Sequence, residues 1–316
     1  PMYDVHNCPD QPPKGYPYEW NTRSLLENWK PDDTNIPSSV HQGLCVFDYR
    51  REYIKASNYR RAEVPFVVRG DPEVAQTVER WNSPGYMNQL LRDDVQHRAE
   101  YSENNHFMYW RPDTMHFKKP SVRKPPTKMI RMTYQDWVQH ANVTDERLLG
   151  PDQPHWYFRL IGCGETGPQG ECDAGSSEYL FDELTFFQPR QGLLYMVEPH
   201  EQKGLHCRFG MKGVIAENHF DSSRNAIAVL GGERRYILSH PKHCQNLALL
   251  PLGHPSARHS AVDWSDPDYE DFPMFANAES NEVVLQAGDV LYLPTNWFHY
   301  IISLSMNFQC NSRSGK

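Results

Sequence analysis

The sequence predicts a mainly β protein whose C-terminal half is a jelly roll or barrel, preceded by a smaller N-terminal α/β extension. The main observation is a set of eight short apolar runs that follow residue 179 and alternate with turn residues. Runs of this length and spacing are typical of the strands of barrels and sandwiches. They cover residues 193–197, 213–219, 226–230, 235–238, 282–285, 290–293, 298–304 and 306–310.

A change of composition along the chain is the second observation, and it indicates three segments. Residues 1–58 are polar and rich in proline, so we expect an extended N-terminal arm. Residues 59–140 mix a short buried strand with helix signals, among them Thr133 as an N-cap, and form the predicted α/β extension. Residues 141–316 form the barrel domain, which a long insertion at 240–281 interrupts.

Length and charge exclude several classes of protein. The chain has 316 residues, which is enough to bury a large core without the help of disulfides. Lysine and arginine number 32 against 40 acidic residues, and the resulting net charge of −8 argues against a nucleic-acid partner. The mean hydropathy is −0.73, and no run approaches the roughly 18 apolar residues that a membrane helix needs.

The cysteine pattern predicts reduced thiols in a cytoplasmic or nuclear protein. The seven cysteines are Cys8, Cys45, Cys163, Cys172, Cys207, Cys244 and Cys310, and no two of them form a C-x-x-C motif. Cys163 and Cys172 flank a glycine-rich loop, so a bond between these two is the alternative. One N-glycosylation sequon is present at Asn142-Val143-Thr144, a triplet that also arises often by chance.

A metal site is indicated by His219 and Asp221, which lie two residues apart at the end of one predicted strand. Residues two apart share a face of a strand, so both side chains can bind one ion. His299 is the candidate third ligand, because a strand–turn–strand segment at 288–299 returns it to the barrel. Of the fifteen histidines, only His219 has an acidic residue two positions later. Two histidines and one carboxylate form the facial triad of non-haem Fe(II) oxygenases.

A rival group of possible ligands lies in the insertion. It contains His240, His243 and Cys244, with His254 and His259 further along the chain. Scattered loop histidines usually bind nothing, but the sequence leaves this group open as a second metal site.

The residues around the predicted triad resemble the JmjC branch of the cupin superfamily, the Fe(II)- and 2-oxoglutarate-dependent oxygenases. The resemblance extends over about residues 60–315, and within the family it is strongest to the asparaginyl hydroxylase that inhibits hypoxia-inducible factor. It implies a double-stranded β-helix with an N-terminal α/β extension. The motifs that carry it are GMKGVIAENHFDSSRN (210–225), GGERRYIL (231–238), VDWSDPDYEDFP (262–273) and GDVLYLPTNWFHYIISL (288–304), with VPFVVRG (64–70) and FMYW (107–110) upstream.

The resemblance also implies roles for individual residues. His219, Asp221 and His299 match the iron ligands. Arg234 stands where the relatives place a lysine that pairs with the distal carboxylate of 2-oxoglutarate, and an arginine can grip a carboxylate with two hydrogen bonds. The other positions that match co-substrate contacts are Tyr157, Asn225 and Asn311, whereas Ala216 replaces a threonine that donates to 2-oxoglutarate.

Two further positions bear on the substrate. Arg258 and His259 align with an arginine–glutamine pair that handles the substrate asparagine in the similar hydroxylase. Because histidine replaces glutamine, the pairing of two amides is not preserved. The C-terminal helices that form the dimer of that relative have no counterpart after the last predicted strand, so we expect a monomer.

The activity that the resemblance implies is an oxygenase reaction with Fe(II) as cofactor and 2-oxoglutarate and O2 as co-substrates. We expect hydroxylation of a side chain of a protein or peptide substrate, with release of succinate and CO2. Demethylation of N-methyl-lysine by a JmjC demethylase is one alternative, and a non-catalytic metal-binding cupin is another.

Overall fold

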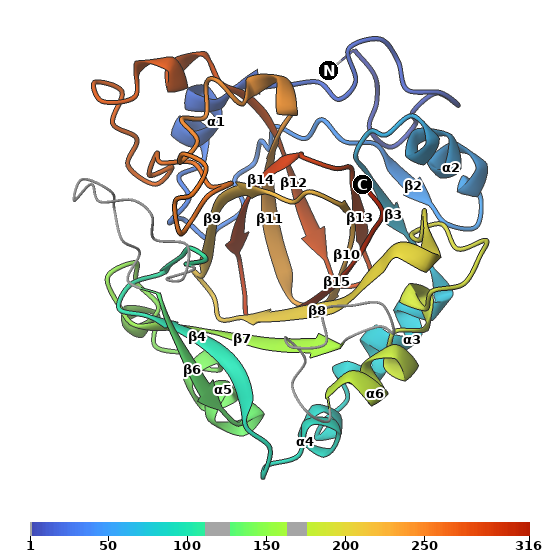
Figure 1. Ribbon diagram of the computed structural model, residues 1–316, viewed down its shortest axis with the longest axis vertical. Coiled ribbons are helices and arrows are strands. Elements are labelled where there is room, and N and C mark those ends of the chain that lie inside the picture. Colours follow the sequence, from blue (N-terminus) through green and yellow to red (C-terminus); the bar gives the residue numbers. More distant parts are fainter. Residues whose placement is uncertain (1, 111–126, 163–175) are drawn as a thin grey trace.

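Two mainly antiparallel sheets face each other and form the barrel in the centre of Figure 1. This computed structural model describes residues 2–110, 127–162 and 176–316. Strands β8, β15, β10 and β13 are neighbours in one sheet, and β12, β11, β14 and β9 are neighbours in the other. The strands are β8 (Gln202–Gly210), β9 (Ile215–Phe220), β10 (Arg224–Gly231), β11 (Glu233–Ser239), β12 (Glu279–Gln286), β13 (Val290–Leu293), β14 (Phe298–Ser303) and β15 (Asn307–Ser314). From β8 to β15 the strands alternate between the two sheets, except that β11 and β12 pair within the smaller one, and this arrangement confirms the predicted mainly β jelly roll.

Seven of the eight predicted runs coincide with strands, and the prediction for residues 193–197 is wrong. This segment is apolar because Leu194 and Tyr195 are buried, yet it pairs with no strand. The carbonyl groups of Leu193 and Leu194 accept hydrogen bonds from the Arg60 guanidinium instead, at 3.0 and 2.9 Å. The missing barrel strand is β8, which the sequence did not reveal because polar and charged residues interrupt its apolar ones.

The N-terminal half lengthens both sheets. In the larger sheet, β7, β4 and β6 continue outward from β8, while β3 and β2 continue outward from β13. In the smaller sheet, β1 pairs with β12 and β5 runs parallel to β9. The bounds are β1 (Trp20–Asn21), β2 (Val46–Asp48), β3 (Phe66–Arg69), β4 (His97–Ser102), β5 (His106–Phe107), β6 (Lys128–Met132) and β7 (His155–Gly162).

Short helices cover the outside of the larger sheet. They are α2 (Tyr53–Arg61), α3 (Pro72–Trp81), α4 (Tyr86–Leu91), α5 (Tyr134–Ala141) and α6 (Ser176–Glu183). Helix α1 (Thr22–Asn28) lies against the smaller sheet. Helix α5 begins at the predicted N-cap Thr133, which forms a capping box with Asp136. No helix among the described residues is long and apolar enough to cross a membrane.

The first 58 residues are folded against the barrel and are not an extended arm. They contain α1 together with strands β1 and β2, and both strands pair with strands of the two sheets. The segment boundaries expected at residues 58 and 140 fall inside α2 and α5. Prolines and polar residues concealed these short elements, whose stability comes from contacts with the barrel.

The insertion at 240–281 packs on the outer face of the smaller sheet. The indole of Trp264 is fully buried and stacks on Tyr300 of β14, with ring centroids 5.2 Å apart. An isolated bridge joins His259 to His219 of β9. The insertion therefore reaches the end of the barrel where the predicted metal ligands lie.

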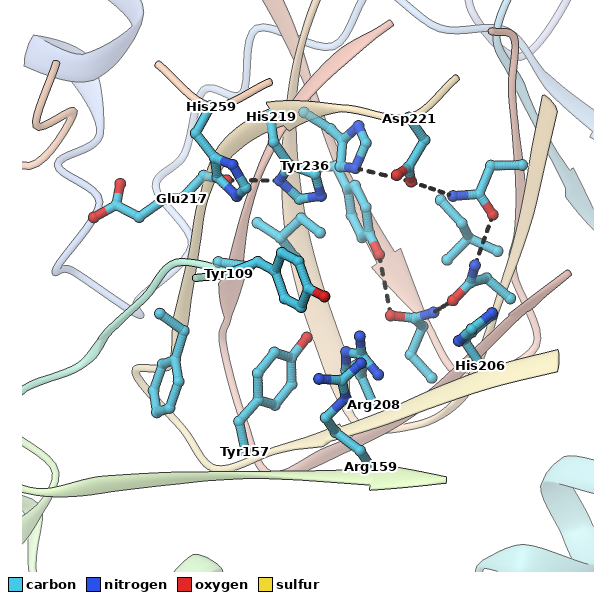
Figure 2. A pocket seen from close by; sticks show the side chains of 18 of the residues that line it. Tyr109, Tyr157, Arg159, His206, Arg208, Glu217, His219, Asp221, Tyr236 and His259 are labelled. Carbon is cyan, nitrogen blue, oxygen red and sulfur yellow. Dashed lines mark hydrogen bonds and ion pairs between the residues drawn. The ribbon is translucent and has the colours of Figure 1, made fainter. Parts of the chain in front are cut away.

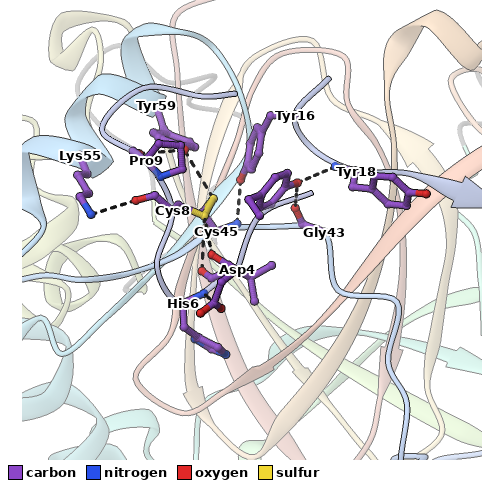
Figure 3. The surroundings of a disulfide bond; sticks show 12 residues. Asp4, His6, Cys8, Pro9, Tyr16, Tyr18, Gly43, Cys45, Lys55 and Tyr59 are labelled. Carbon is purple, nitrogen blue, oxygen red and sulfur yellow. Dashed lines mark hydrogen bonds between the residues drawn. A yellow bond between two sulfur atoms is a disulfide. The ribbon is translucent and has the colours of Figure 1, made fainter. Parts of the chain in front are cut away.

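Two disulfides contradict the prediction that the cysteines are reduced. Cys8 bonds to Cys45, as Figure 3 shows, and Cys207 bonds to Cys310. The partners are 37 and 103 residues apart in the sequence, so only the tertiary fold brings them together. The alternative pair, Cys163 and Cys172, lies outside the described residues.

We expect the buried ion pair between Arg235 and Glu282 to be essential for stability. Both side chains are fully buried, with Arg235 Nη2 2.6 Å from Glu282 Oε2. Arg235→Met leaves the carboxylate buried without its cation and should lower the free energy of unfolding by about 3–5 kcal/mol in urea titrations. Arg23→Met, which removes the cation of the exposed Arg23–Glu27 pair, is the control and should produce no measurable change. Equal effects of the two substitutions would contradict this expectation.

Candidate metal centre and cavity

Pairing between β9 and β14 brings two of the predicted metal ligands together. His299 lies directly opposite His219 in the register, and the centroids of the two rings are 4.2 Å apart. Asp221 follows β9 by one residue, and its carbonyl accepts a hydrogen bond of 2.8 Å from the Asn296 amide. The ligand atoms of His219, Asp221 and His299 all lie within 4.8 Å of one another.

Backbone carbonyls set the orientation of both imidazoles. Nδ1 of His219 lies 2.7 Å from the carbonyl oxygen of Glu217, and Nδ1 of His299 lies 3.1 Å from that of Trp297. Each Nδ1 therefore carries the proton and donates it to the carbonyl, which leaves the Nε2 lone pair available. A histidine that binds a metal through one ring nitrogen usually donates the proton of the other nitrogen to a nearby acceptor, which fixes the orientation of the ring.

Burial keeps both histidines neutral, as metal ligands must be. It lowers the pKa of His219 well below its usual value, and the neighbouring His299 and His259 lower it further. Burial also lowers the pKa of His299. Neutral imidazoles at neutral pH bind a metal without first losing a proton.

Asp221 is held as a carboxylate by the cations around it. Burial alone would raise its pKa, but the positive charge of Arg313 and, less strongly, that of Arg258 bring the pKa below its usual range. Arg313 Nη2 lies 2.9 Å from Asp221 Oδ2, and Arg258 Nη1 lies 3.4 Å from Oδ1. Two neutral imidazoles and one anionic carboxylate fit a facial triad for Fe(II).

A cavity of about 280 Å³ opens beside the triad between the two sheets. Figure 2 shows His219, Asp221 and His259 at one end of it, and Arg159, Arg208 and His206 at the opposite end. Its lining is Glu100, Phe107, Tyr109, Tyr157, Arg159, His206, Arg208, Ala216, Glu217, His219, Asp221, Asn225, Ile227, Tyr236, Arg258, His259, His299, Ile301, Gln309, Asn311 and Arg313. A molecule in the cavity can therefore touch a metal at one end and guanidinium groups at the other.

Arg234, expected from the sequence to meet a carboxylate directly, is fully buried and is absent from this lining. Its guanidinium donates to Gln309 Oε1 at 2.7 Å, to Tyr157 Oη at 3.1 Å and to the carbonyl oxygen of Arg208 at 3.0 Å. It also contacts Asn307 through Nε. Arg234 therefore lies behind the wall of the cavity and holds other wall residues in place.

Tyr157 itself lines the cavity, and its hydroxyl points into it (Figure 2). Because the hydroxyl oxygen accepts a hydrogen bond from Arg234, its own proton remains available for a ligand. The fold thus brings Tyr157 and Arg234 together, with Tyr157 on the cavity wall and Arg234 behind that wall.

The structure adds Arg208 and Arg159, two wall residues that the sequence analysis did not find. Nη1 of Arg208 is buried and has no hydrogen-bond partner among the described residues. Burial, with the positive charge of Arg159 next, lowers the pKa of Arg208 to about 9. Arg159 is paired with Glu100 at 2.8 Å. Recognition of β8 as a strand would have placed His206 and Arg208 on one face of the barrel.

An unbroken chain of amides joins the triad to Arg234. Asn225 Nδ2 donates to Asp221 Oδ2 at 3.2 Å, and Asn311 Nδ2 donates to Asn225 Oδ1 at 2.9 Å. Gln309 then donates through Nε2 to Asn311 Oδ1 at 3.3 Å, and its Oε1 accepts a hydrogen bond from Arg234. Of the two predicted asparagines, Asn225 therefore contacts the carboxylate of Asp221 directly, and Asn311 holds Asn225.

The two predicted substrate residues lie at the triad end of the cavity. The ring of His259 stacks on that of His219 with centroids 4.9 Å apart, and its Nδ1 donates to the carbonyl of Ser256 at 3.1 Å. Burial lowers the pKa of His259 to about 4. Arg258 is partly exposed and contacts Asp221, so both residues can meet a substrate that approaches the triad.

The rival ligands of the insertion do not share one site among the described residues. His243 is buried and pairs with Glu19 and Glu279, and Lys242 also contacts Glu19. His254 packs on Trp110, and His259 belongs to the cavity. A third group, His106, Glu217 and Asp263, lies next to the cavity, with His106 Nδ1 2.7 Å from Glu217 Oε1.

A jelly roll with a 2-His-1-carboxylate group at one end of its interior has the layout of the metal-binding cupins. Comparison with known families agrees, because the profile of the cupin-like domain matches residues 52–312. The chain therefore belongs to the cupin-like domain family, and JmjC proteins are among its relatives.

Three relatives illustrate the range of functions within the family. JmjC domain-containing protein D of Dictyostelium discoideum is 33% identical over 104 residues, which are 33% of this chain and 23% of the relative. Lysine-specific demethylase 8 of Xenopus tropicalis is 34% identical over 105 residues, 33% and 23% of the two chains. The tRNA wybutosine-synthesizing protein 5 of Gallus gallus is 32% identical over 96 residues, 30% and 29% of the two.

These alignments cover less than a third of each relative. JmjC proteins generally use Fe(II) and 2-oxoglutarate, and the donors described above fit such a metal. The buried, unpartnered nitrogen of Arg208 also fits an anionic co-substrate, because a buried donor without a partner is costly.

We expect the metal-free protein to lose stability as the pH falls from 7 to 5. The pKa of His259 is about 4 when folded and near 6.5 when unfolded, so at pH 5 only the unfolded chain binds the proton. This difference alone lowers the free energy of unfolding by about 2 kcal/mol at pH 5. Urea titrations should show a smaller pH-dependent loss in His259→Asn, which retains a donor for Ser256. Equal losses in both proteins would show that His259 is not the source.

Proposed function

We propose that the protein is an Fe(II)- and 2-oxoglutarate-dependent dioxygenase that hydroxylates a side chain of a protein or peptide. The observation that carries the proposal is one cavity with a 2-His-1-carboxylate group at one end and guanidinium groups at the other. A dicarboxylate suits this cavity, because one of its ends can bind the metal while the other meets the guanidinium groups. Bound Fe(II) and 2-oxoglutarate would supply the oxidising power that inserts one oxygen atom of O2 into a C–H bond, with succinate and CO2 as co-products.

His219, Asp221 and His299 would hold the iron. Asn225 and Arg313 both donate to Asp221 Oδ2, at 3.2 and 2.9 Å, and so fix the plane of the carboxylate. The carbonyls of Glu217 and Trp297 keep both Nε2 lone pairs directed toward the same point. The chain thus presents a preorganised set of donors on one side and leaves the cavity side open to ligands.

Arg208 and Tyr157 are the residues that we propose to bind the distal carboxylate of 2-oxoglutarate. Both line the cavity, and each has a donor that its described neighbours do not use. Arg234, the sequence-based choice, would act as a positioning residue that orients Tyr157 and Gln309. On this proposal, the resemblance to the asparaginyl hydroxylase of hypoxia-inducible factor that the sequence motifs imply would be one of layout, with the direct cation on β8 and not on β11.

Substrate would enter at the triad end, past Arg258 and His259. Neutral His259 offers its Nε2 as an acceptor, because its Nδ1 proton is donated to Ser256. Arg258 carries a positive charge beside it, so the entrance suits a polar or acidic peptide side chain. We keep the expectations of a monomer and of no nucleic-acid or membrane partner as parts of the same proposal.

Demethylation of N-methyl-lysine is the second candidate, because two relatives in Arabidopsis thaliana are named lysine-specific demethylases JMJ30 and JMJ31. A methylated ammonium group needs aromatic and acidic neighbours, which Tyr109 and Glu217 could provide. The four arginines of the lining oppose a cationic substrate. Release of formaldehyde with a methylated peptide would favour demethylation over hydroxylation. A non-catalytic metal-binding cupin is the third candidate.

Anaerobic titration of the metal-free protein with Fe(II) and 2-oxoglutarate tests the class of reaction. We expect the visible charge-transfer band of the chelate in the wild type and none in Asp221→Ala or His219→Ala, since each variant lacks one ligand. Asp266→Ala, an exposed acid of the insertion, is the control and should keep the band. Fe(II) binding by the wild type without the band would leave the metal-only cupin as the better description.

Binding of 2-oxoglutarate to Arg208→Met tests the proposed anchor. Loss of a charged hydrogen bond costs about 1.5–3 kcal/mol, so the dissociation constant should rise at least tenfold. The wild type should prefer 2-oxoglutarate to 2-oxopentanoate, which lacks the distal carboxylate, and Arg208→Met should lose this preference. Lys212→Met, outside the cavity, is the control. If Arg234→Met abolishes the preference and Arg208→Met does not, Arg234 makes the direct contact.

A further inference from the structure

We propose that the protein folds in an oxidising, glycosylating compartment and carries an N-linked glycan on Asn142. This goes beyond the oxygenase activity and does not depend on it. Two unrelated features support it, namely the buried disulfides and the exposed position of the sequon Asn142-Val143-Thr144.

The disulfides are structural parts of the fold. Cys207 and Cys310 face each other on β8 and β15, the strands that carry Arg208 and Asn311, and both are fully buried. A buried disulfide is shielded from attack by thiolates, so these bonds do not belong to the transient, redox-sensing kind. They therefore form as the barrel folds.

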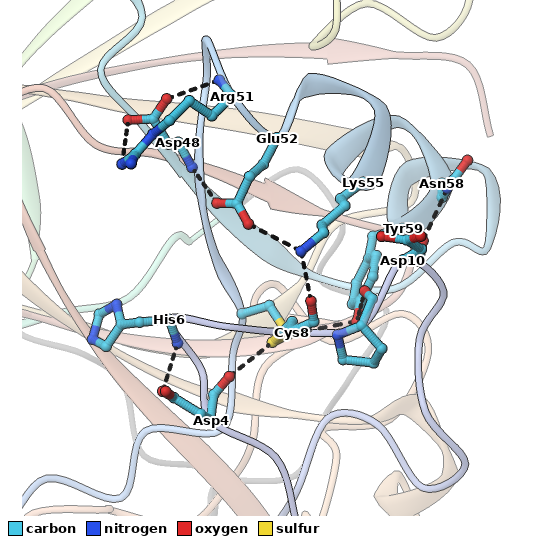
Figure 4. A network of polar contacts seen from close by, with 12 residues as sticks. Asp4, His6, Cys8, Asp10, Asp48, Arg51, Glu52, Lys55, Asn58 and Tyr59 are labelled. Carbon is cyan, nitrogen blue, oxygen red and sulfur yellow. Dashed lines mark hydrogen bonds and ion pairs between the residues drawn. A yellow bond between two sulfur atoms is a disulfide. The ribbon is translucent and has the colours of Figure 1, made fainter.

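The second bond lies within the N-terminal segment and links its start to the residue that directly precedes β2. Cys8 and Cys45 are at most 2% exposed and lie beside Tyr16 and Tyr59 (Figure 3). Polar contacts reinforce this junction, because Lys55 Nζ donates to the carbonyl of Cys8 at 3.0 Å and pairs with Glu52 at 3.2 Å (Figure 4). The segment is thus built around a bond that the cytosol would not maintain.

The distribution of cysteines points the same way. Of the five cysteines in the described residues, four are paired, and the remaining Cys244 is exposed. Glutathione and thioredoxin keep cytosolic thiols reduced, so buried structural disulfides indicate folding in an oxidising compartment. Each bond forms when two thiols give two protons and two electrons to the disulfide of an oxidoreductase, which becomes a dithiol.

The sequon lies where a transferase can reach it. Asn142 is the C-cap of α5, and its backbone N–H donates a hydrogen bond of 2.8 Å to the Val138 carbonyl. The side chains of Asn142 and Thr144 are exposed. It is the sole N-x-S/T triplet without proline in the sequence. A glycan there extends into solvent from a turn between two ordered elements.

A glycan at this position leaves the cavity open. Helix α5 packs on the outer face of β7, where Trp137 contacts Phe158 with ring centroids 5.9 Å apart. The alternate residues of β7, Tyr157 and Arg159, face the cavity on the other side. Helix α5, which ends at Asn142, and the cavity therefore lie on opposite faces of β7 (Figure 1).

The modification is a transfer of an oligosaccharide from a lipid diphosphate. A bond forms between Asn142 Nδ2 and the anomeric carbon of the oligosaccharide, and the bond from that carbon to the lipid diphosphate breaks. The lipid diphosphate leaves with the electron pair of this bond. One amide proton passes to the transferase.

Peptide mapping of the full-length protein isolated from the cells that make it tests the proposal. Free thiols are first blocked with iodoacetamide, and the protein is digested without reduction. Peptide N-glycosidase in heavy-oxygen water then labels each glycosylated asparagine. We expect peptides linked through Cys8–Cys45 and Cys207–Cys310, with full labelling at Asn142. Alkylated thiols at these four positions would overturn the compartment, and an unlabelled Asn142 would overturn the glycan site.

Variants of the full chain, secreted from cultured eukaryotic cells, separate recognition of the sequon from effects on folding. Asn142→Gln and Thr144→Ala should each remove the glycosidase-sensitive mass, and Val143→Ala should keep it. Asn142 and Thr144 are exposed and Val143 is half-buried, so the disulfide-linked peptides should be unchanged in all three. Retention of the glycan in Thr144→Ala would overturn the assignment to Asn142.

Discussion

The candidate site depends on the antiparallel register between β9 and β14. Because His219 and His299 are direct partners, their imidazoles lie side by side on the inner face of the smaller sheet. A shift of one residue would turn one of them to the outer face, where the insertion packs. The sheet itself, through its hydrogen bonds and the apolar packing on both sides, thus fixes the geometry of the proposed metal ligands.

A second constraint is the balance of charge inside the barrel. Asp221 stays ionised in a buried place because Arg313 and Arg258 contact it, and Glu100 compensates Arg159 at the other end. Arg208 has no such partner among the described residues, so the cavity retains an uncompensated positive charge. This imbalance favours an anionic ligand and is consistent with the cupin-like family to which the chain belongs.

Sequence patterns predicted the parts of the fold that rest on local order. Strand β13 coincides with the predicted run, and the N-cap Thr133 begins α5. Alternation along β9 was enough to place His219 and Asp221 on one side. The helices and strands of the first 58 residues were missed because short elements draw their stability from the barrel and leave little periodicity in the sequence.

By itself, the sequence determined the class of fold, the three candidate metal ligands and the family resemblance, because spacing along a strand dictates which side chains share a face. Only the tertiary structure decided which arginine faces the cavity. Arg234 and Arg208 lie on different strands, and which of them lines the cavity depends on how the two sheets pack. The disulfides were likewise decided by the fold, since contacts between residues 37 and 103 positions apart follow from strand pairing and chain packing and leave no local pattern.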